Sequence, residues 1–374
     1  MGKLKVLTVC GTRPDTIKMA PIINELKKFP DKVELIEVVT GQHKEMLEQV
    51  LKAFDLHPMY NLNIMAAKQT LSSITTKILT GLEELIQKHE PNLIIAQGDT
   101  STTFAASLSA FYHKIPFAHI EAGLRTNNKY DPFPEEMNRR MTGLLAELHF
   151  APTDVNRDNL LKENVNPDDI FITGNTVIDA LLYIAGQDYK FEDEKLNELI
   201  KNKKIILLTT HRRENWGEPM RDICKAVKRI VKDYPDYTVV FPVHKNPIVR
   251  DVVYPEFEGV ENVYLTEPFD YVPFVHIQKV SSLILTDSGG VQEEAPSLGV
   301  PVIVLRKTTE RPEGVKAGNS KLVGTDPEKI YDTVKELIEN KSAYDKMSKA
   351  ANPYGEGKSA EKTIQIIFER YGIK

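Results

Sequence analysis

The sequence has few cysteines, no excess of positive charge and no long apolar run. Only two of the 374 residues are cysteines, and Cys10 and Cys224 form neither a metal-binding spacing nor a disulfide framework, so a reducing compartment is expected. Lysine and arginine number 48 against 53 aspartate and glutamate residues, which argues against a nucleic-acid binder. No run approaches the roughly 20 apolar residues of a membrane span, and the first residues lack the apolar core of a signal peptide. We therefore expect a soluble cytoplasmic protein that binds neither nucleic acid nor membrane.

A glycine-rich dinucleotide loop is also missing where the first predicted strand meets the first predicted helix. The stretch VCGTRPDTIKMAP, residues 9–21, lies at the junction where a Rossmann unit carries its phosphate loop. Gly11 is the only glycine of this turn, and Pro14 suits the first turn of a helix. Arg13 and Lys18 supply positive charge instead, which favours a small anionic ligand.

Short apolar, β-branched runs alternate with segments of helical period along the chain. Continuous apolar strands between helices are typical of parallel sheets covered on both faces, and a length of 374 residues suggests two domains of roughly 100 to 200 residues each. We predict an α/β protein with two Rossmann-like, doubly wound parallel-sheet domains facing a cleft, residues 1–169 and 170–357. A C-terminal helix, residues 358–374, is expected to pack back on the first domain. The predicted strands are KVLTVC, VELIEVV, NLIIAQ, IPFAHI, ELHFAP, KIILLTT, YTVVFPV, NVYLTE, SLILTD and VPVIVLR.

Acidic residues follow the strands of the first half, and in open α/β sheets ligands bind at these carboxyl ends. Asp99 follows the strand NLIIAQ, where it either contacts a ligand or caps the next helix. Glu121 follows IPFAHI and precedes an irregular loop, a position that favours a site. Glu135 and Glu136 open a predicted helix, where acids also suit the helix dipole. The first domain therefore offers several carboxylates for acid–base chemistry.

Basic and glycine-rich stretches follow the strands of the second half. His211 and His244 each end a strand beside a cation, which indicates an anionic ligand, although a single histidine there would be an ordinary surface residue. In DSGGVQEE, residues 287–294, the Ser-Gly-Gly turn lets backbone N–H groups approach a diphosphate at a helix N-terminus. Glu294 lies one turn later, where a carboxylate suits a ribose diol. A plain capped turn is the alternative interpretation.

Two such domains would suit any nucleotide-sugar enzyme of the GT-B architecture, which says little about chemistry. The full set of motifs, however, resembles the non-hydrolysing UDP-N-acetylglucosamine 2-epimerases closely and in the order of that family. The matching stretches cover essentially the whole chain and are GTRPDTIKMAP, QGDTSTTFAASLSAFY, HIEAGLRTNNKYDPFPEEMNR, FITGNTVIDAL, THRRENWGEP, PVHKNP, LTDSGGVQEEAPSLGVPV, TTERPEGVKAG and NPYGEGKSA.

The resemblance implies three groups of site residues. The catalytic group is Asp99, Glu121, Glu135 and His211. The group that binds the substrate is Arg13, Lys18, Phe274, Ser288, Gly289, Gly290, Glu294 and Arg311. The candidate group for an allosteric UDP-GlcNAc is Gln42, His43, Lys68, Arg212 and His244, to which Glu135 also contributes. Two residues depart from the family: Glu45 stands where some members carry glutamine, and Asp15 stands where glutamate is usual. We expect Asp15 to open the helix and to spare the reaction.

The resemblance also implies the chemistry. Members of the family interconvert UDP-GlcNAc and UDP-ManNAc by eliminating UDP to a 2-acetamidoglucal and adding it back, with no cofactor and no metal. The product UDP-ManNAc would supply a cell-envelope polysaccharide, and the resemblance favours a homodimer formed through helices of the first domain. Three alternatives stay open at this point: a hydrolysing epimerase that releases UDP and ManNAc, a GT-B glycosyltransferase, and a non-catalytic sensor of UDP-sugars.

Overall fold

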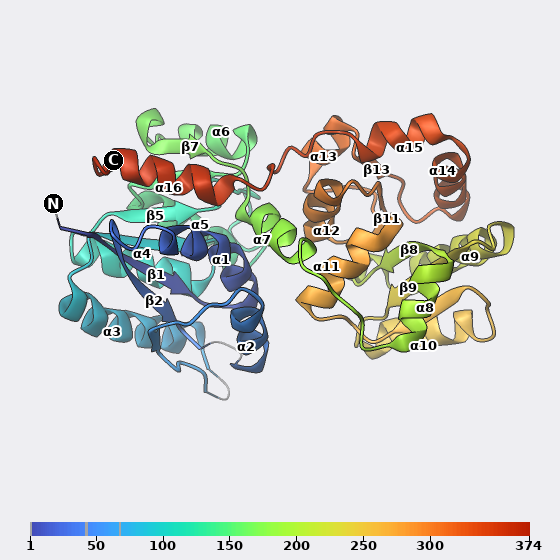
Figure 1. Ribbon diagram of the computed structural model, residues 1–374, viewed down its shortest axis with the longest axis horizontal. Helices are drawn as coiled ribbons and strands as arrows, with labels where there is room; N and C mark the ends of the chain where they lie inside the picture. The colour runs from blue at the N-terminus through green and yellow to red at the C-terminus, as the bar shows by residue number, and fades with distance from the viewer. Residues whose placement is uncertain (1, 42–43, 67–68) are drawn as a thin grey trace. The chain divides into compact units, whose positions relative to one another are not determined.

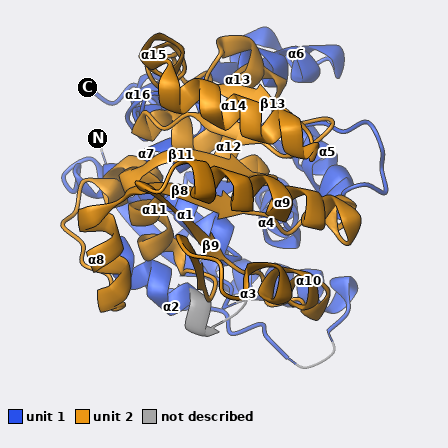
Figure 2. Cartoon of the chain, turned by 90° about the vertical axis from the view of Figure 1, so that its right-hand side faces the viewer, with its two compact units in different colours: residues 1–180, 354–374 blue, residues 181–353 orange. Residues whose placement is uncertain are grey.

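The computed structural model describes residues 2–41, 44–66 and 69–374 and divides the chain into two compact units (Figure 1). Residues 1–180 and 354–374 form unit 1, and residues 181–353 form unit 2, as the two colours of Figure 2 show. The predicted boundary at residues 169/170 lies earlier than this division. The reason is strand β7 (Ile170–Ile172), which pairs in parallel with β6 (Leu148–Ala151) and so completes the sheet of unit 1.

Unit 1 is built around a seven-stranded parallel sheet in the order β3-β2-β1-β4-β5-β6-β7. The order reverses between β1 and β4, and the loops that leave the two strands at such a switch point separate to form a ligand crevice. Its remaining strands are β1 (Leu4–Cys10), β2 (Val33–Val39), β3 (Tyr60–Asn61), β4 (Leu93–Gln97) and β5 (Phe117–Ile120). Its helices are α1 (Arg13–Lys27), α2 (Lys44–Ala53), α3 (Leu71–His89), α4 (Ser101–Tyr112), α5 (Glu135–Leu145), α6 (Asp154–Lys162), the first half of α7 (Thr176–Ala185) and α16 (Ser359–Arg370).

Unit 2 repeats the same topology with a six-stranded parallel sheet in the order β10-β9-β8-β11-β12-β13. Its switch point therefore lies between β8 and β11. The strands are β8 (Lys204–Thr209), β9 (Tyr237–Pro242), β10 (Val263–Thr266), β11 (Ser281–Thr286), β12 (Val302–Val304) and β13 (Ser320–Leu322). The helices are α8 (Glu194–Asn202), α9 (Glu218–Asp233), α10 (Pro247–Phe257), α11 (Tyr271–Val280), α12 (Gly289–Glu294), α13 (Pro312–Ala317), α14 (Pro327–Glu339) and α15 (Lys341–Ser348).

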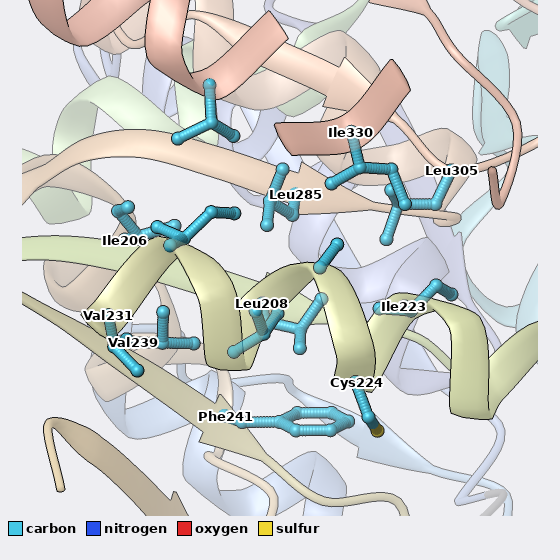
Figure 3. Packing of buried hydrophobic residues seen from close by; sticks show 14 of the residues in the cluster. Ile206, Leu208, Ile223, Cys224, Val231, Val239, Phe241, Leu285, Leu305 and Ile330 are labelled. Atoms are coloured by element: carbon cyan, nitrogen blue, oxygen red, sulfur yellow. The ribbon is translucent and has the colours of Figure 1, made fainter. Parts of the chain in front are cut away.

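The cores confirm the expectation of parallel sheets covered on both faces. In unit 2, Leu208 of β8 and Leu285 of β11 are fully buried and pack against Ile223 of α9, as Figure 3 shows. Each such aliphatic side chain contributes about 1.5 to 3 kcal/mol by its removal from water. Among the described residues, none of the helices has the length and apolarity needed to cross a membrane.

The last helix, α16, packs within unit 1 against α1 (Figure 1). The rings of Phe29 and Phe368 meet edge to face with centroids 5.1 Å apart. The backbone N–H of Ala360 donates to Asp179 Oδ1 at 2.9 Å, and Arg370 pairs with Asp169 at 2.9 Å. Unit 1 is consequently made of two separate stretches of chain, and unit 2 is inserted between them.

Candidate functional site

Two acidic residues leave the neighbouring strands β4 and β5 of unit 1. Gly98 follows β4 with φ +80° and delivers Asp99, and Glu121 follows β5 with φ +65°. A left-handed backbone is unfavourable for a residue with a side chain and persists only where the surroundings enforce it, a situation common at functional sites. Glu121 is the residue with this unfavourable backbone, and it follows β5, the neighbour of switch-point strand β4.

Glu121 is held by donors from three elements. Lys18 Nζ of α1 lies 2.6 Å from Glu121 Oε1, and Asn175 Nδ2, which follows β7, donates to the same oxygen at 2.9 Å. Gln97, the last residue of β4, donates to Oε2. The Glu121 side chain is 8% exposed, so these donors replace water and stabilise its ionised form.

Asp99 pairs with Arg139 of α5, and its backbone carbonyl accepts from Asn138 Nδ2 at 2.9 Å. Burial raises the pKa of the Asp99 carboxyl; the Arg139 charge opposes this rise, and the Glu121 charge adds to it. The helix cap is a different residue, Thr100, whose hydroxyl accepts from the N–H of Thr103 at 3.4 Å. The predicted cap before this helix is therefore supplied by Thr100 and not by Asp99, whose carboxylate faces Arg139 instead.

The Glu135-Glu136 pair divides into two environments. Glu135 is the first residue of α5 and is half-buried, which leaves it available as the third candidate acid. Glu136 is fully buried and accepts from the N–H groups of Thr126 and Asn127 at 3.0 and 3.2 Å. Glu136 thus fixes the loop that connects Glu121 to α5.

The GTRPDTIK stretch forms a compact turn around Asp15. Thr12 caps α1, and Asp15 completes a capping box, which confirms Asp15 as the acid that opens the helix. Asp15 Oδ2 accepts from the Thr12 N–H at 3.1 Å and from Thr100 Oγ1 at 3.0 Å. Asp15 is 6% exposed, and burial raises its pKa to about 6. A side chain at Gly11 has no room, because its Cβ would lie 2.5 Å from Thr102 Oγ1.

The two cations of this stretch occupy different places. Arg13 is the first residue of α1 and is half-buried. Lys18, expected to point at a diphosphate, has its ammonium on Glu121 in this structure. The expected approach of Arg13 to the Ser-Gly-Gly loop involves both units and stays a prediction.

His211 follows β8 at the switch point of unit 2. Its Nδ1 lies 3.4 Å from Oδ1 of the buried Asp287, and its ring is stacked toward that of His244 with centroids 6.0 Å apart. Burial lowers the pKa of His211, the Asp287 charge opposes this effect, and the Arg212 charge adds to it. Burial therefore disfavours the charged form of His211, and its imidazole is able to exchange a proton.

The Ser-Gly-Gly turn follows the neighbouring strand β11, and two guanidinium groups lie beside it. A Cβ placed on Gly289 would be 3.9 Å from Arg212 Nη2 and 3.9 Å from Arg311 Cζ. Ser288 occupies the cap position of α12, and Arg311 also pairs with the buried Glu293. Two planar cations beside an open backbone turn suit the oxygens of a phosphate group.

The remaining predicted residues of unit 2 line α11 and α12. Phe274 of α11 is partly buried against the core of unit 2. Glu294 ends α12, is 9% exposed and accepts from Gln278 Nε2 at 3.1 Å. Gly290, next to Gly289, also has space around it, since a Cβ there would meet only Ser288 Oγ at 3.9 Å.

Several candidate allosteric residues, Gln42, His43 and Lys68, lie outside the described residues, as does the side chain of Glu45. Arg212 and His244 are described, and both lie close to His211 or to the Ser-Gly-Gly turn. The candidate allosteric residues of unit 2 thus adjoin the candidate catalytic histidine.

Sequence reasoning missed four residues that hold the predicted ones: Gln97, Arg139, Asn175 and Asp287. All four stood inside quoted motifs, and Asp287 lies next to a predicted residue, which was the available signal. Arg139 and Asn175 reach their partners only through the fold, 40 and 54 residues away along the chain.

The fold and the two switch points define a class, that of two-domain α/β proteins with GT-B-like units, here with carboxylates at strand ends in one unit and a Ser-Gly-Gly turn beside two guanidinium groups in the other. The family model of UDP-N-acetylglucosamine 2-epimerase matches residues 24–368. The chain is 52% identical over 374 residues to the UDP-N-acetylglucosamine 2-epimerase of Bacillus subtilis, covering 100% of this chain and 97% of that protein.

Solved structures agree with this match. A crystal structure of UDP-N-acetylglucosamine 2-epimerase superposes with a TM-score of 0.94 at 50% identity, covering 100% of this chain and 98% of that one. The enzyme of Neisseria meningitidis, solved with UDP-GlcNAc bound, gives a TM-score of 0.82 at 47% identity, covering 98% of this chain and 100% of that one. The chain belongs to the UDP-N-acetylglucosamine 2-epimerase family and is an epimerase, an enzyme of the isomerase class.

Proposed function

We propose that the protein interconverts UDP-GlcNAc and UDP-ManNAc without hydrolysis, by elimination and readdition of UDP. The observation that carries the proposal is the pair of acids that leave the neighbouring strands β4 and β5, Asp99 and Glu121, one with a raised pKa and the other ion-paired with a lysine. The UDP-GlcNAc bound to the Neisseria meningitidis relative supports the choice of substrate.

Inversion at C-2 of this sugar needs an elimination because no carbonyl group flanks the C-2 proton. In the forward step a base takes that proton, the C-2–H electron pair forms the C-1=C-2 double bond, and the C-1–O bond breaks with its electrons leaving on UDP. In the return step UDP oxygen attacks C-1 and an acid protonates C-2 from the opposite face. Atoms and charge balance without an oxidant or a reductant.

The side chains of unit 1 would exchange the protons. General acids and bases act within hydrogen-bond reach and work best with a pKa near the working pH. Burial shifts the pKa of Asp99 upward, in the direction of the second condition, and three donors hold the Glu121 carboxylate in place. Glu135 is the third acid of the proposed set.

The side chains of unit 2 would hold UDP. The backbone N–H groups of Ser288–Gly290 and the Arg311 guanidinium would bind the diphosphate, Phe274 would contact the uracil, and Glu294 would accept from the ribose hydroxyls. His211, once Nε2 has taken up a proton in the presence of the anionic substrate, would donate to the diphosphate as negative charge builds on it; preorganised donors of this kind contribute about 3 to 4 kcal/mol each to the transition state.

Proton NMR of UDP-GlcNAc incubated with the protein in deuterated water tests the proposal. The expected result is UDP-ManNAc that carries deuterium at C-2, with deuterium also entering the recovered UDP-GlcNAc. Free ManNAc and UDP as the products would indicate a hydrolysing epimerase instead. Turnover only after addition of a sugar acceptor would indicate a glycosyltransferase, and tight UDP binding with no turnover a sensor.

We further propose a homodimer formed through helices of unit 1. Large apolar side chains are exposed on α4 and α5, two helices in contact: Phe111 is 60% exposed, Tyr112 67% and Leu144 79%. Sedimentation should give a dimer for the wild type and a monomer for Leu144→Asp. A wild type that sediments as a monomer, or a Leu144→Asp variant that stays dimeric, would contradict this interface.

We also propose that a second molecule of UDP-GlcNAc regulates the enzyme. A second UDP-GlcNAc would bind at Arg212 and His244 and activate the enzyme. UDP-ManNAc alone would then turn over slowly until a trace of UDP-GlcNAc is added, and equal rates with and without the trace would contradict activation.

Cys10 and Cys224 are free and buried, which supports a location in the reducing cytoplasm. There the product would feed synthesis of a cell-envelope polysaccharide.

A further inference from the structure

Asp287 is a fully buried carboxylate at the switch point of unit 2. It follows β11 directly, and its backbone N–H donates to the carbonyl of Thr209 at 3.2 Å, which extends the pairing of β8 and β11 by one residue. Its side chain turns toward the loop that leaves β8. A charge withdrawn from water at this depth is retained only when donors surround it.

The donors all come from one short segment, residues 210–215. Asp287 Oδ2 accepts from Thr210 Oγ1 at 2.7 Å, from the Arg212 N–H at 2.9 Å and from Asn215 Nδ2 at 2.9 Å. The His211 N–H also donates to this oxygen, at 3.0 Å. A single carboxylate oxygen therefore holds the loop through the side chains of its first and last residues and through two backbone N–H groups between them.

The second oxygen of Asp287 faces the imidazole. Oδ1 lies 3.4 Å from His211 Nδ1, and a carboxylate beside Nδ1 favours the tautomer that carries its proton there. The His211 side chain is 43% exposed, whereas Asp287 is fully buried. The nitrogen left to meet a ligand is therefore Nε2.

The same residue also fixes the anion-binding turn. Asp287 is covalently joined to Ser288, whose N–H donates to Thr286 Oγ1 at 3.0 Å, and Arg212 lies beside Gly289. Asn215 Nδ2 additionally donates to the carbonyl of Leu305, which ties the loop to the chain after β12. The histidine, the arginine and the Ser-Gly-Gly turn thus form one rigid group centred on Asp287.

We propose that Asp287 is a positioning residue for the reaction: it locks the loop of residues 210–215 against the Ser288–Gly290 turn and holds the Nδ1–H of His211 toward itself. Nε2 then faces the diphosphate of the substrate and takes up the proton through which His211 donates to it. The role rests on the proposed function, since it acts through His211 on the departing UDP. Asp287 itself does not touch the substrate.

A double-mutant cycle tests whether Asp287 acts through His211. Asp287→Asn keeps the size of the side chain but replaces one acceptor oxygen by an amide NH₂ group, which cannot accept hydrogen bonds from the surrounding donors. We expect its kcat to fall by about 100-fold or more with the KM for UDP-GlcNAc changed less than about fivefold. In a His211→Asn background the same substitution should change kcat less than about fivefold. Equal effects in the two backgrounds would overturn the proposal. Thr210→Val, which removes one donor and keeps the carboxylate, is the matched control and should lower kcat less than about tenfold.

A second measurement needs no change at Asp287 and no turnover. Nitrogen-15 NMR of the imidazoles in the wild-type protein reports the tautomer directly, with the His211 signal assigned by its loss in His211→Asn. We expect a protonated Nδ1 and an unprotonated Nε2 at about pH 7.5. An Nε2–H tautomer would overturn the proposal even if the enzyme is active. Absence of epimerisation in the wild type with the expected tautomer would refute the proposed function and leave the Asp287–His211 geometry intact.

Discussion

Replacing Asp15 by asparagine should stabilise the folded protein at neutral pH and not at acid pH. Asp15 is 6% exposed, and both of its donors, the Thr12 N–H and Thr100 Oγ1, bind the same oxygen. An asparagine can present its carbonyl oxygen at that position and keep both hydrogen bonds. It would lose only the charge, which burial makes unfavourable.

The size of the effect follows from the pKa. Burial raises the pKa of Asp15 from 3.8 to about 6, so the folded state binds this proton more tightly than the unfolded state does. The free energy of unfolding of the wild type therefore falls as the pH rises through this window, by about 3 kcal/mol in full. Between about pH 4.5 and pH 7.5 the stability of Asp15→Asn relative to the wild type should rise by about 2 kcal/mol.

Urea unfolding followed by circular dichroism at several pH values measures this difference. Asp31→Asn, which changes an exposed carboxylate in the loop after α1, is the matched control and should give a difference independent of pH. Carbon-13 NMR of the Asp15 carboxyl gives its pKa directly, with the signal assigned by its loss in Asp15→Asn. A stability difference that is flat with pH, or a carboxyl that titrates near 4, would refute the reasoning.

Three further predictions concern the site and its supports. Asp99→Asn should lower kcat by about 10² to 10⁴-fold while calorimetry finds UDP affinity within about twofold of wild type; retained turnover would show that Asp99 is not a catalytic acid. Gly123→Ala should cost about 3 kcal/mol or more in urea unfolding, because Gly123 has φ +90° and its Cβ would lie 2.2 Å from the carbonyl oxygen of Asn156. Gly318→Ala is its control, with φ +84° and nothing within 4 Å, and should cost only about 1 to 2 kcal/mol; equal costs would show that the clash is relieved. Burial lowers the pKa of His119 to about 3 and that of His149 to about 4, so both rings stay neutral while the unfolded chain takes up protons below about pH 6.5. Each should cost about 2 kcal/mol of stability by about pH 5, and imidazole NMR signals that titrate near 6.5 would contradict this.

The sequence was sufficient for the fold class because the apolar runs that form the cores are continuous and long enough to recognise. The ten predicted strands are present, whereas β3, β7 and β13 have only two or three residues, too few for a periodic pattern. The overlooked β7 accounts for the early boundary, since the sheet of unit 1 extends through Ile172.

The placement of Asp99, Glu121 and His211 at the ends of strands was predictable, because each follows an apolar run in the sequence. The ion pairs and hydrogen bonds around these residues were not predictable. Lys18 reads as a free cation in the sequence, yet its charge lies on Glu121, 103 residues further along the chain. Such pairs depend on which strands become neighbours, and no local pattern encodes that order.

The insertion of unit 2 into unit 1 has a consequence for synthesis on the ribosome. Residues 181–353 emerge while α1 still lacks its cover, because α16 is among the last segments to be made. At about 5 to 20 residues per second, the synthesis of this segment takes roughly 10 to 30 s, and α1 stays uncovered during that time. Unit 2 has its whole sequence available first and can fold first, and the early half of unit 1 must stay soluble with Phe29 unpaired until Phe368 arrives. A chain truncated before residue 354 would therefore hold a finished unit 2 and an unfinished unit 1.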